Sequence, residues 1–240
     1  MILNILGARG PYPAKGEPTS GYLLMTKEAN ILIECGSGVL TRLLNFISFD
    51  DISFIICSHL HADHTSDLGV LRYYLASRGK EIDLYIPSEP KEEYNLIRKG
   101  VYRVKEIENN MEIEIGNLSI KFLEGQHPYK SFAVRIEENG KVFGFSGDTG
   151  FKEELIEFFK EADLLLLNAA YTDKEVEKIE SEKRFHLSPK QAAEIAKKAN
   201  AKLLVLTHLK PECNEKEHFM SAKEVFENIV LGTNMEVIEF

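Results

Sequence analysis

The sequence predicts an α/β fold in which two sheets pack together and helices lie outside them. Segments rich in apolar and β-branched residues give way to helical segments twice along the chain, which is typical of such a layered arrangement. The chain has 240 residues, of which 44% are hydrophobic, and this suits one sizeable domain or two closely packed halves. We therefore expect residues 1–240 to form a single domain built from two pseudo-repeated αβ halves.

The first half reads mainly as strands. Residues 52–57 are apolar and β-branched, as expected of a buried strand, and Leu68, Leu71 and Leu75 follow at roughly helical spacing. The expected strands are residues 1–6, 21–26, 30–34, 52–57 and 82–86, and the expected helices are residues 67–77 and 90–100.

The second half begins with a hairpin around Gly116-Asn117 and then alternates strands with helices. Ser188 and Gln191 form a capping box with Pro189 at the first helical position, and Ser221 and Glu224 repeat that box. The expected strands are residues 111–115, 118–124, 131–137, 141–146, 163–169, 202–207 and 236–240, and the expected helices are residues 152–161, 189–199 and 222–229.

Composition excludes several classes of function. The balance of 29 basic and 38 acidic residues gives a net charge of −9, which argues against a broad basic surface for nucleic acid. No apolar run reaches membrane-spanning length, and the first residues lack the pattern of a secretory signal. Cys35, Cys57 and Cys213 are odd in number and widely spaced, so we expect no disulfide framework and a cytoplasmic protein.

Residues 59–64 are the most informative segment, because they read His-x-His-x-Asp-His. The segment lies between the expected strand at residues 52–57 and the helix that follows it, where side chains can converge on one point. Imidazoles with a carboxylate suit zinc or a similar divalent ion. The sequence therefore predicts a metal site that includes His59, His61, Asp63 and His64.

Four further residues lie where an expected strand or helix meets a loop: His127, Asp148, His186 and His208. Taken singly, an aspartate in a glycine-flanked turn or a histidine at a strand end has an ordinary structural explanation. With His59, His61 and His64, they bring the histidines at the ends of elements to six of the seven, and only His218 is left without an assignment.

This ordered set of histidines and aspartates resembles the metallo-β-lactamase fold superfamily of hydrolases. The resemblance covers essentially the whole chain, including the loop at residues 7–22 and the segment Ile33-Glu34-Cys35-Gly36. It implies a four-layer αββα sandwich with two metal ions in a cleft at one edge of the paired sheets. It also implies the following ligands: His59, His61 and His127 for one ion, Asp63, His64 and His208 for the second, and Asp148 bridging both.

The chemistry of this donor set is consistent with two metal ions. Seven ligands are too many for one tetrahedral ion but fill two sites that leave room for water. A hydroxide held between two cations is a nucleophile at neutral pH. Redox di-iron members of the resembled fold usually carry a carboxylate at the position of His61, so that residue favours hydrolysis. The ions are expected to be Zn²⁺, with Mn²⁺ or iron as alternatives.

His186 directs the prediction toward phosphate esters. The ribonuclease Z and phosphodiesterase branch of the resembled superfamily has a histidine in this context, and the resemblance implies that it contacts the phosphate and assists the leaving group. The residue stands before a capped helix, whose free N–H groups attract anions. We therefore expect His186 and Asp63 to be catalytic, with Asp63 able to relay a proton while ligating the second ion.

The interval between His127 and Asp148 directs the prediction away from transfer RNA. Ribonuclease Z carries a long transfer-RNA-binding arm there, whereas this interval spans 148 − 127 = 21 residues. A small or cyclic phosphodiester, or a short nucleotide, is the expected substrate. Two departures from the resembled pattern concern metal affinity: Glu34 stands where aspartate is usual, and Asn168 where an acid is usual.

The sequence is also compatible with other functions. A carboxylic-ester hydrolase such as a lactonase or thioesterase shares the His-x-His-x-Asp-His core. Transfer RNA 3′ processing and a non-catalytic metal-binding module are further alternatives. Relatives of the resembled fold are often dimers, so a homodimer is also an expectation.

Overall fold

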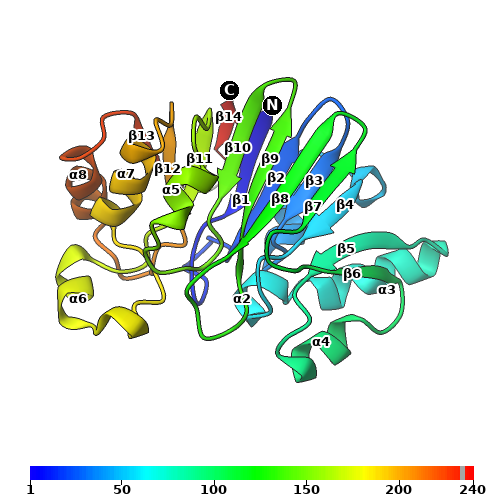
Figure 1. Cartoon of the computed structure of the whole chain (residues 1–240). Coiled ribbons are helices and arrows are strands. Elements are labelled where there is room, and N and C mark those ends of the chain that lie inside the picture. Colours follow the sequence, from blue (N-terminus) through cyan, green and yellow to red (C-terminus); the bar gives the residue numbers. More distant parts are fainter. Residues whose placement is uncertain (233–235) are drawn as a thin grey trace. The chain divides into compact units, whose positions relative to one another are not determined.

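The computed structural model describes residues 1–232 and 236–240. Contacts between residues divide the chain into two compact units, Met1–Ile107 with Thr233–Glu239 and Glu108–Gly232 with Phe240. They are named unit 1 and unit 2 in that order. Figure 1 shows the course of the chain and the labels of its elements.

Unit 1 contains a seven-stranded sheet with the strand order β14-β1-β2-β3-β4-β5-β6. The pairs from β14 to β3 are antiparallel, and the pairs from β3 to β6 are parallel. The strands are β1 (Ile2–Gly7), β2 (Gly21–Met25), β3 (Asn30–Ile33), β4 (Phe54–Ile56), β5 (Ile82–Ile86), β6 (Tyr102–Glu106) and β14 (Val237–Glu239). The helices are α1 (Val39–Leu43), α2 (Ala62–Thr65), α3 (Leu68–Arg78) and α4 (Lys91–Ile97), with a 3-10 turn η1 (Phe49–Asp51).

Helices α1 and α3 bury their apolar residues against the sheet of unit 1. Leu71 and Leu75 of α3, spaced one turn apart, share a buried cluster with Leu32, Ile55 and Leu84 from three neighbouring strands. The helix predicted at residues 67–77 is confirmed by α3, and the one at residues 90–100 by the shorter α4. The short helix α2, inside the His-rich segment, was not predicted.

Unit 2 contains a second seven-stranded sheet, with the order β13-β12-β11-β10-β9-β8-β7. Its pairs from β7 to β10 are antiparallel and those from β10 to β13 are parallel, the same succession as in unit 1. The strands are β7 (Glu112–Ile115), β8 (Leu118–Glu124), β9 (Phe132–Glu138), β10 (Lys141–Phe145), β11 (Leu164–Asn168), β12 (Leu204–Thr207) and β13 (Ile229–Leu231). The helices are α5 (Glu154–Phe158), α6 (Asp173–Lys178), α7 (Pro189–Lys198) and α8 (Glu215–Lys223), with a 3-10 turn η2 (Ser181–Lys183).

Helix α7 organises the core of unit 2. Its apolar face, with Ala192, Ile195 and Ala196 fully buried, packs in one cluster with Leu167 and Leu206 of the central strands. The predicted capping box is confirmed: the Ser188 hydroxyl accepts from the Gln191 N–H, and the Gln191 side chain accepts from the Ser188 N–H. Figure 1 shows α7 and α8 side by side next to β12.

The helix predicted at residues 222–229 is wrong. Helix α8 instead runs from Glu215 to Lys223 and is capped by the Asn214 side chain, which accepts from the Glu217 N–H. Ser221 therefore lies near the end of the helix, and its predicted box with Glu224 does not form there. The residues that follow form β13, because parallel pairing with β12 buries Ile229.

The three cysteines are free thiols. Within the described residues, no helix has the length and apolar character needed to cross a membrane. The expectation of one domain over residues 1–240 stays a prediction.

Candidate metal centre

The His-rich segment of unit 1 turns sharply after β4. His61 is extended and precedes α2, and the Thr65 hydroxyl donates to its carbonyl at 3.0 Å. The Cys35 N–H donates to the His64 carbonyl at 2.8 Å, and the Asp67 N–H donates to the Cys35 carbonyl at 3.0 Å. These bonds fix the turn against the segment that follows β3.

A close backbone approach explains the glycine in that neighbouring segment. A Cβ placed on Gly36 would lie 2.0 Å from the Asp63 carbonyl oxygen and 2.3 Å from the Thr19 hydroxyl. Only glycine leaves room for the Asp63 backbone here. Gly36 therefore sets how closely the His-rich turn packs against the end of β3.

The four predicted ligands of unit 1 lie together. His59 Nε2 is 3.0 Å from His61 Nδ1, and the His59 and His64 rings have centroids 4.1 Å apart. His64 Nε2 is 3.4 Å from Asp63 Oδ2. His59, Asp63 and His64 are buried, whereas His61 is half-buried. Several imidazole nitrogens and a carboxylate oxygen thus converge within one turn of the chain.

Glu34 contacts the His-rich segment at Ser58 and His64. Its buried carboxylate accepts from the Ser58 N–H at 2.9 Å through Oε1, and Oε2 lies 3.5 Å from His64 Nδ1. Ligand atoms of Glu34, His59 and His64 all lie within 4.8 Å of one another. A carboxylate beside the far nitrogen of a histidine orients that ring and raises its basicity as a metal ligand. Glutamate at this position therefore reaches the histidine, and the departure noted in the sequence is compatible with a metal site.

The predicted residues of unit 2 also lie together, although they come from four separate loops. Asp148 follows β10, His208 follows β12, His127 follows β8 and His186 precedes α7. Asp148 Oδ2 is 3.2 Å from His208 Nε2 and 3.8 Å from His186 Nδ1. The His186 and His208 rings stack at 5.3 Å with an interplanar angle of 14°. Ligand atoms of His127, Asp148 and His186 lie within 4.8 Å of one another.

Asn168 holds two of these loops in place. The side chain is 1% exposed, and its Nδ2 donates to the carbonyls of Gly147 and Thr149, both at 3.1 Å. Its Oδ1 accepts from the Leu187 N–H at 2.9 Å. A carboxylate cannot donate to two carbonyls, so the amide suits this position better than an ionised acid. Asn168 thereby links the turn that carries Asp148 to the segment that carries His186.

Gln126 also links the loop after β10 to the segment that precedes His186. Its backbone N–H donates to the Thr149 hydroxyl at 2.8 Å, and its Nε2 donates to the carbonyls of Ser181 at 2.6 Å and Arg184 at 3.1 Å. A Cβ on Gly150 would lie 1.8 Å from the Arg184 carbonyl oxygen, so the two loops touch through their backbones. His127, the next residue, is therefore carried on a firmly held segment.

Aromatic side chains surround the histidines of unit 2. The Tyr171 ring meets the His186 ring edge-on at 5.2 Å, and Tyr129 and Phe185 lie 6.5 and 6.3 Å from His127. Burial raises the pKa of the Tyr171 hydroxyl, and the charges of Glu175 and Asp148 raise it further, so Tyr171 remains a neutral phenol. These residues were not predicted from the sequence. Tyr129 and Phe185 could have been noticed as near neighbours of predicted ligands, whereas nothing in the sequence connects Tyr171 with His186.

Both donor sets fit divalent metal ions. Neutral imidazole nitrogens and carboxylate oxygens are the usual ligands of zinc, and neighbouring carboxylates or carbonyls orient them. Each unit brings its share of the predicted residues into one place: His59, His61, Asp63 and His64 in unit 1, and His127, Asp148, His186 and His208 in unit 2.

Comparison with known sequences agrees with this arrangement. A family model described as a beta-lactamase superfamily domain matches residues 29–209. The chain is 29% identical over 221 residues to the Bacillus subtilis protein YhfI, named as a probable metallo-hydrolase, with 87% of each chain covered. It is also 27% identical, over 306 aligned positions, to the ribonuclease Z of Clostridium tetani, covering 98% of this chain and 97% of that one.

Solved structures share the fold. The crystal structure of Bacillus subtilis YhfI, described as a metallo-beta-lactamase fold protein, matches with a TM-score of 0.92 and 26% identity over 100% of this chain and 98% of that chain. The short form of human tRNase Z matches with a TM-score of 0.81 and 22% identity over 100% and 99%.

Two seven-stranded sheets with helices, carrying His/Asp clusters suited to metal ions, define a metallo-hydrolase of the metallo-β-lactamase fold. The chain belongs to the β-lactamase superfamily. The expected α/β fold class, the αββα sandwich of that family, is confirmed.

Proposed function

We propose that this protein is a dinuclear metal-dependent phosphodiesterase acting on small or cyclic phosphodiesters in the cytoplasm. The proposed cofactors are two divalent ions, Zn²⁺ in the first instance. The proposed ligands are His59, His61 and His127 for one ion, Asp63, His64 and His208 for the other, and Asp148 for both.

The observation that carries the choice of phosphodiesters is the position of His186. Its ring stacks on that of His208, and its Nδ1 lies 3.8 Å from Asp148, so it stands beside two proposed ligands without being needed as one. Its side chain is 19% exposed and so can be reached by a substrate. It also precedes the N-terminus of α7, which is the positive end of the helix dipole. These features support a role for His186 at a phosphate.

The proposed chemistry divides between the ions and the side chains. Bound divalent ions would activate a water molecule as nucleophile and stabilise negative charge on the phosphate. His186 would donate a hydrogen bond to a phosphoryl oxygen or a proton to the leaving alkoxide. Asp63, whose Oδ2 lies 3.4 Å from His64 Nε2, would relay the proton released by the attacking water.

The short connection between His127 and Asp148 supports a small substrate. It consists of β9 and β10, paired in a tight antiparallel hairpin around Asn139 and Gly140. The alignment with the Clostridium tetani enzyme spans 306 positions, whereas this chain has 240 residues, so at least 306 − 240 = 66 positions of that relative have no counterpart here. A transfer-RNA-binding arm is not accommodated in a hairpin of this length.

The test is a substrate panel on metal-analysed protein. Bis-p-nitrophenyl phosphate and cyclic nucleotides would be supplied with Zn²⁺ or Mn²⁺ to the wild type and to His186→Ala. We expect metal-dependent hydrolysis of at least one diester, with kcat about 100-fold lower in His186→Ala. Lys160→Ala, an exposed change in the same unit, is the control and should retain wild-type activity. Absence of metal-dependent turnover for every diester would refute the proposal.

Transfer RNA processing is the second candidate, because the ribonuclease Z relative aligns over nearly the whole of both chains. A precursor transfer RNA added to the same panel separates the two. Cleavage of the precursor at rates above those of the small diesters would favour the second candidate. Lactones and thioesters belong in the panel as well, and high activity on them that survives His186→Ala would indicate a carboxylic-ester hydrolase. Size measurements on the same protein would test the expected homodimer.

A further inference from the structure

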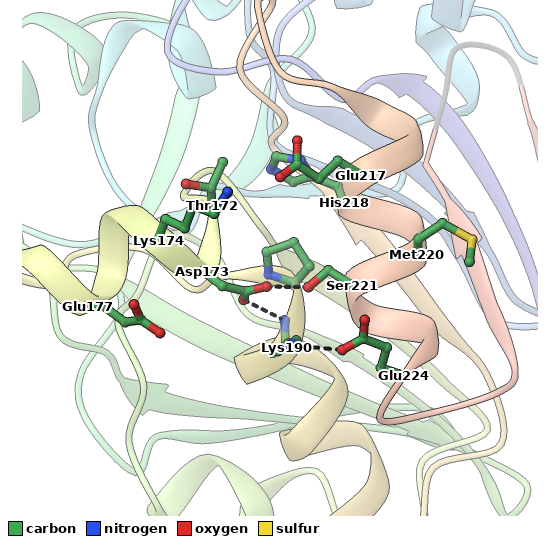
Figure 2. Close-up of a pocket in the computed structure, with 11 residues that line it drawn as sticks. Thr172, Asp173, Lys174, Glu177, Lys190, Glu217, His218, Met220, Ser221 and Glu224 are labelled. Atoms are coloured by element: carbon green, nitrogen blue, oxygen red, sulfur yellow. Dashed lines mark hydrogen bonds and ion pairs between the residues drawn. The ribbon is translucent and has the colours of Figure 1, made fainter.

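A pocket of about 430 Å³ lies in unit 2 among α6, α7 and α8, and no proposed metal ligand lines it. Figure 2 shows its lining, which comes from the beginning of α6, the first turn of α7 and one face of α8. A volume of this size is within the range of small-molecule sites. The proposed phosphodiesterase activity makes no use of this pocket.

Polar contacts hold the three helices around the pocket. The Asp173 carboxylate accepts from the Ser221 hydroxyl and from the Lys190 N–H, the latter at 3.2 Å. The Lys190 ammonium lies 2.9 Å from the Glu224 carboxylate. Figure 2 shows these contacts as dashed lines that join α6, α7 and α8. The hollow is therefore a built feature of the unit and not an accidental gap between loosely placed side chains.

His218 supplies a buried acceptor to this pocket. The side chain is one of the lining groups, is 2% exposed, and projects from α8 toward Thr172 in Figure 2. Its Nδ1 lies 3.2 Å from the Asn214 carbonyl oxygen. A carbonyl can only accept, so Nδ1 donates to it, and the uncharged tautomer with its proton on Nδ1 has a lone pair on Nε2. Among the described residues Nε2 has no hydrogen-bond partner, although buried polar atoms in folded proteins almost always have one.

The charge of the lining favours a cation. Four carboxylates face two ammonium groups, which gives a formal balance of 2 − 4 = −2. The charged residues are Asp173, Glu177, Glu217, Glu224, Lys174 and Lys190. A hydrogen-bond acceptor inside an acidic pocket calls for a ligand that is both positively charged and a donor.

An organic cation fits this pocket better than a metal ion. Among the described residues His218 belongs to no group of three His, Cys, Asp or Glu ligand atoms close enough to hold an ion. Protein sites for zinc normally supply at least three such ligands. Exposed Met220 and buried Pro189 add apolar surface that methylene groups could cover.

We propose that the pocket binds a small organic cation, an ammonium or guanidinium compound, through an N–H donated to His218 Nε2 and charge attraction to Glu177 and Glu217. This site shares no residue with the proposed phosphodiesterase centre. The proposal of cation binding therefore does not depend on the proposed phosphodiesterase activity.

The experiment is an NMR titration of the full-length protein with putrescine and with methylguanidinium, following the Cε1–H resonance of His218. 1,4-Butanediol, which matches putrescine in length but carries no charge, is the ligand control. We expect saturable shifts with either cation and none with the diol, and weaker binding at high salt. His218→Ala identifies the resonance and should weaken binding, detected at the remaining lining residues, about ten-fold or more.

His218 is buried, so replacing it can disturb the fold as well as binding. A variant at an exposed residue of the lining is therefore needed as a second test. Glu217→Gln is exposed and should weaken binding about three-fold, whereas Glu227→Gln, the same change beyond the pocket, should leave it unaltered. The proposal is overturned if neither cation shifts the His218 resonance, if the diol binds as well as putrescine, or if Glu217→Gln and Glu227→Gln behave alike. Zn²⁺ binding at His218 more tightly than either cation would overturn it in favour of a metal site.

Discussion

Asn168 is a buried residue that positions the candidate site of unit 2 without being one of the predicted ligands. Its amide donates to the carbonyls on either side of Asp148 and accepts from the N–H that follows His186. Sequence comparison alone treats the residue as a missing acid. The structure shows that its two donors are what the surrounding carbonyls require.

Asn168→Asp should therefore destabilise the protein and weaken metal binding. The substitution removes two donors and places a second carboxylate near Asp148 in a buried location, a change that costs about 3 kcal/mol. Urea unfolding and metal content at neutral pH would measure both effects. Asn139→Asp, in the exposed turn between β9 and β10, is the matched control. Equal unfolding midpoints for the two variants would contradict this role of Asn168.

Asp163 gives a prediction about acid stability. Burial alone would raise the pKa of this carboxyl, but hydrogen bonds from the Lys202 ammonium, the Val142 N–H and the Lys141 ammonium outweigh it and hold the pKa below its ordinary value. A depressed pKa contributes stability that is present above the unfolded pKa of about 3.9 and is lost as pH falls through the folded pKa.

The wild type should accordingly be more stable than Asp163→Asn between pH 5 and 7 by about 1–3 kcal/mol, and the difference should shrink below about pH 4. Denaturant unfolding at a series of pH values measures it. A difference that stayed constant down to about pH 2 would show that the ionised carboxylate is not the cause.

At the scale of elements, the N-terminus of α7 connects stability to the site. Ser188 caps the helix immediately after His186 and Leu187. Ser188→Ala should lower the free energy of unfolding by about 1 kcal/mol, the usual cost of losing an N-cap. Ser77→Ala makes the same chemical change inside α3, where alanine favours the helix, and should be neutral or slightly stabilising. If both variants unfold alike, the cap contributes nothing.

The strands were predictable because apolar, β-branched runs are typical of strands buried in a sheet. The strand at residues 52–57, with Ile55 and Ile56 completely buried, is an example, although β4 itself is shorter. The helix predicted at residues 222–229 failed because Ser221 and Glu224 imitate a capping box inside the last turn of α8. Pairing of Ile229 with Leu204 then determines β13, and that contact joins residues 25 positions apart, from 229 − 204.

The candidate site could be predicted only in part from the sequence. Its histidines and aspartates could be named because they are chemically distinctive and stand at the ends of strands. The roles of Asn168 and Gln126 could not, since each depends on backbone carbonyls from two other loops. No local pattern marks a side chain that will bond to carbonyls some 20 to 60 positions away, as the separations of 19 for Asn168 and 58 for Gln126 show.

At the scale of the whole molecule, the proposed metal centre makes stability depend on metal. Ligands that bind only the folded state stabilise it by about 2.7 kcal/mol at a hundred times their Kd. Removing metal with a chelator should therefore lower Tm and abolish activity, and restoring Zn²⁺ should recover both. Calorimetry and metal analysis would measure two ions per chain in the loaded protein.

Variants of His61 and His127 test the ligands proposed for the first ion. His61→Ala in unit 1 and His127→Ala in unit 2 should each lower affinity for the same ion, so the double variant should lose little more than either single one. Losses that simply add would mean that the two histidines do not ligate the same ion, which would contradict the proposed ligand set.

The pairing of β14 with β1 has a consequence for synthesis of the chain. Asn4 pairs with Val237. The strand that covers the outer edge of β1 is therefore translated 237 − 4 = 233 residues after it. At ordinary rates of translation this delay lasts roughly 10–50 s. Through that interval a nascent chain presents an open strand edge, which other chains can join. Strand β14 thus covers an edge that could otherwise pair with another chain. A chain truncated after Gly232 would leave the outer edge of β1 exposed. Its aggregation, compared with that of the full chain, would measure the protection that β14 provides.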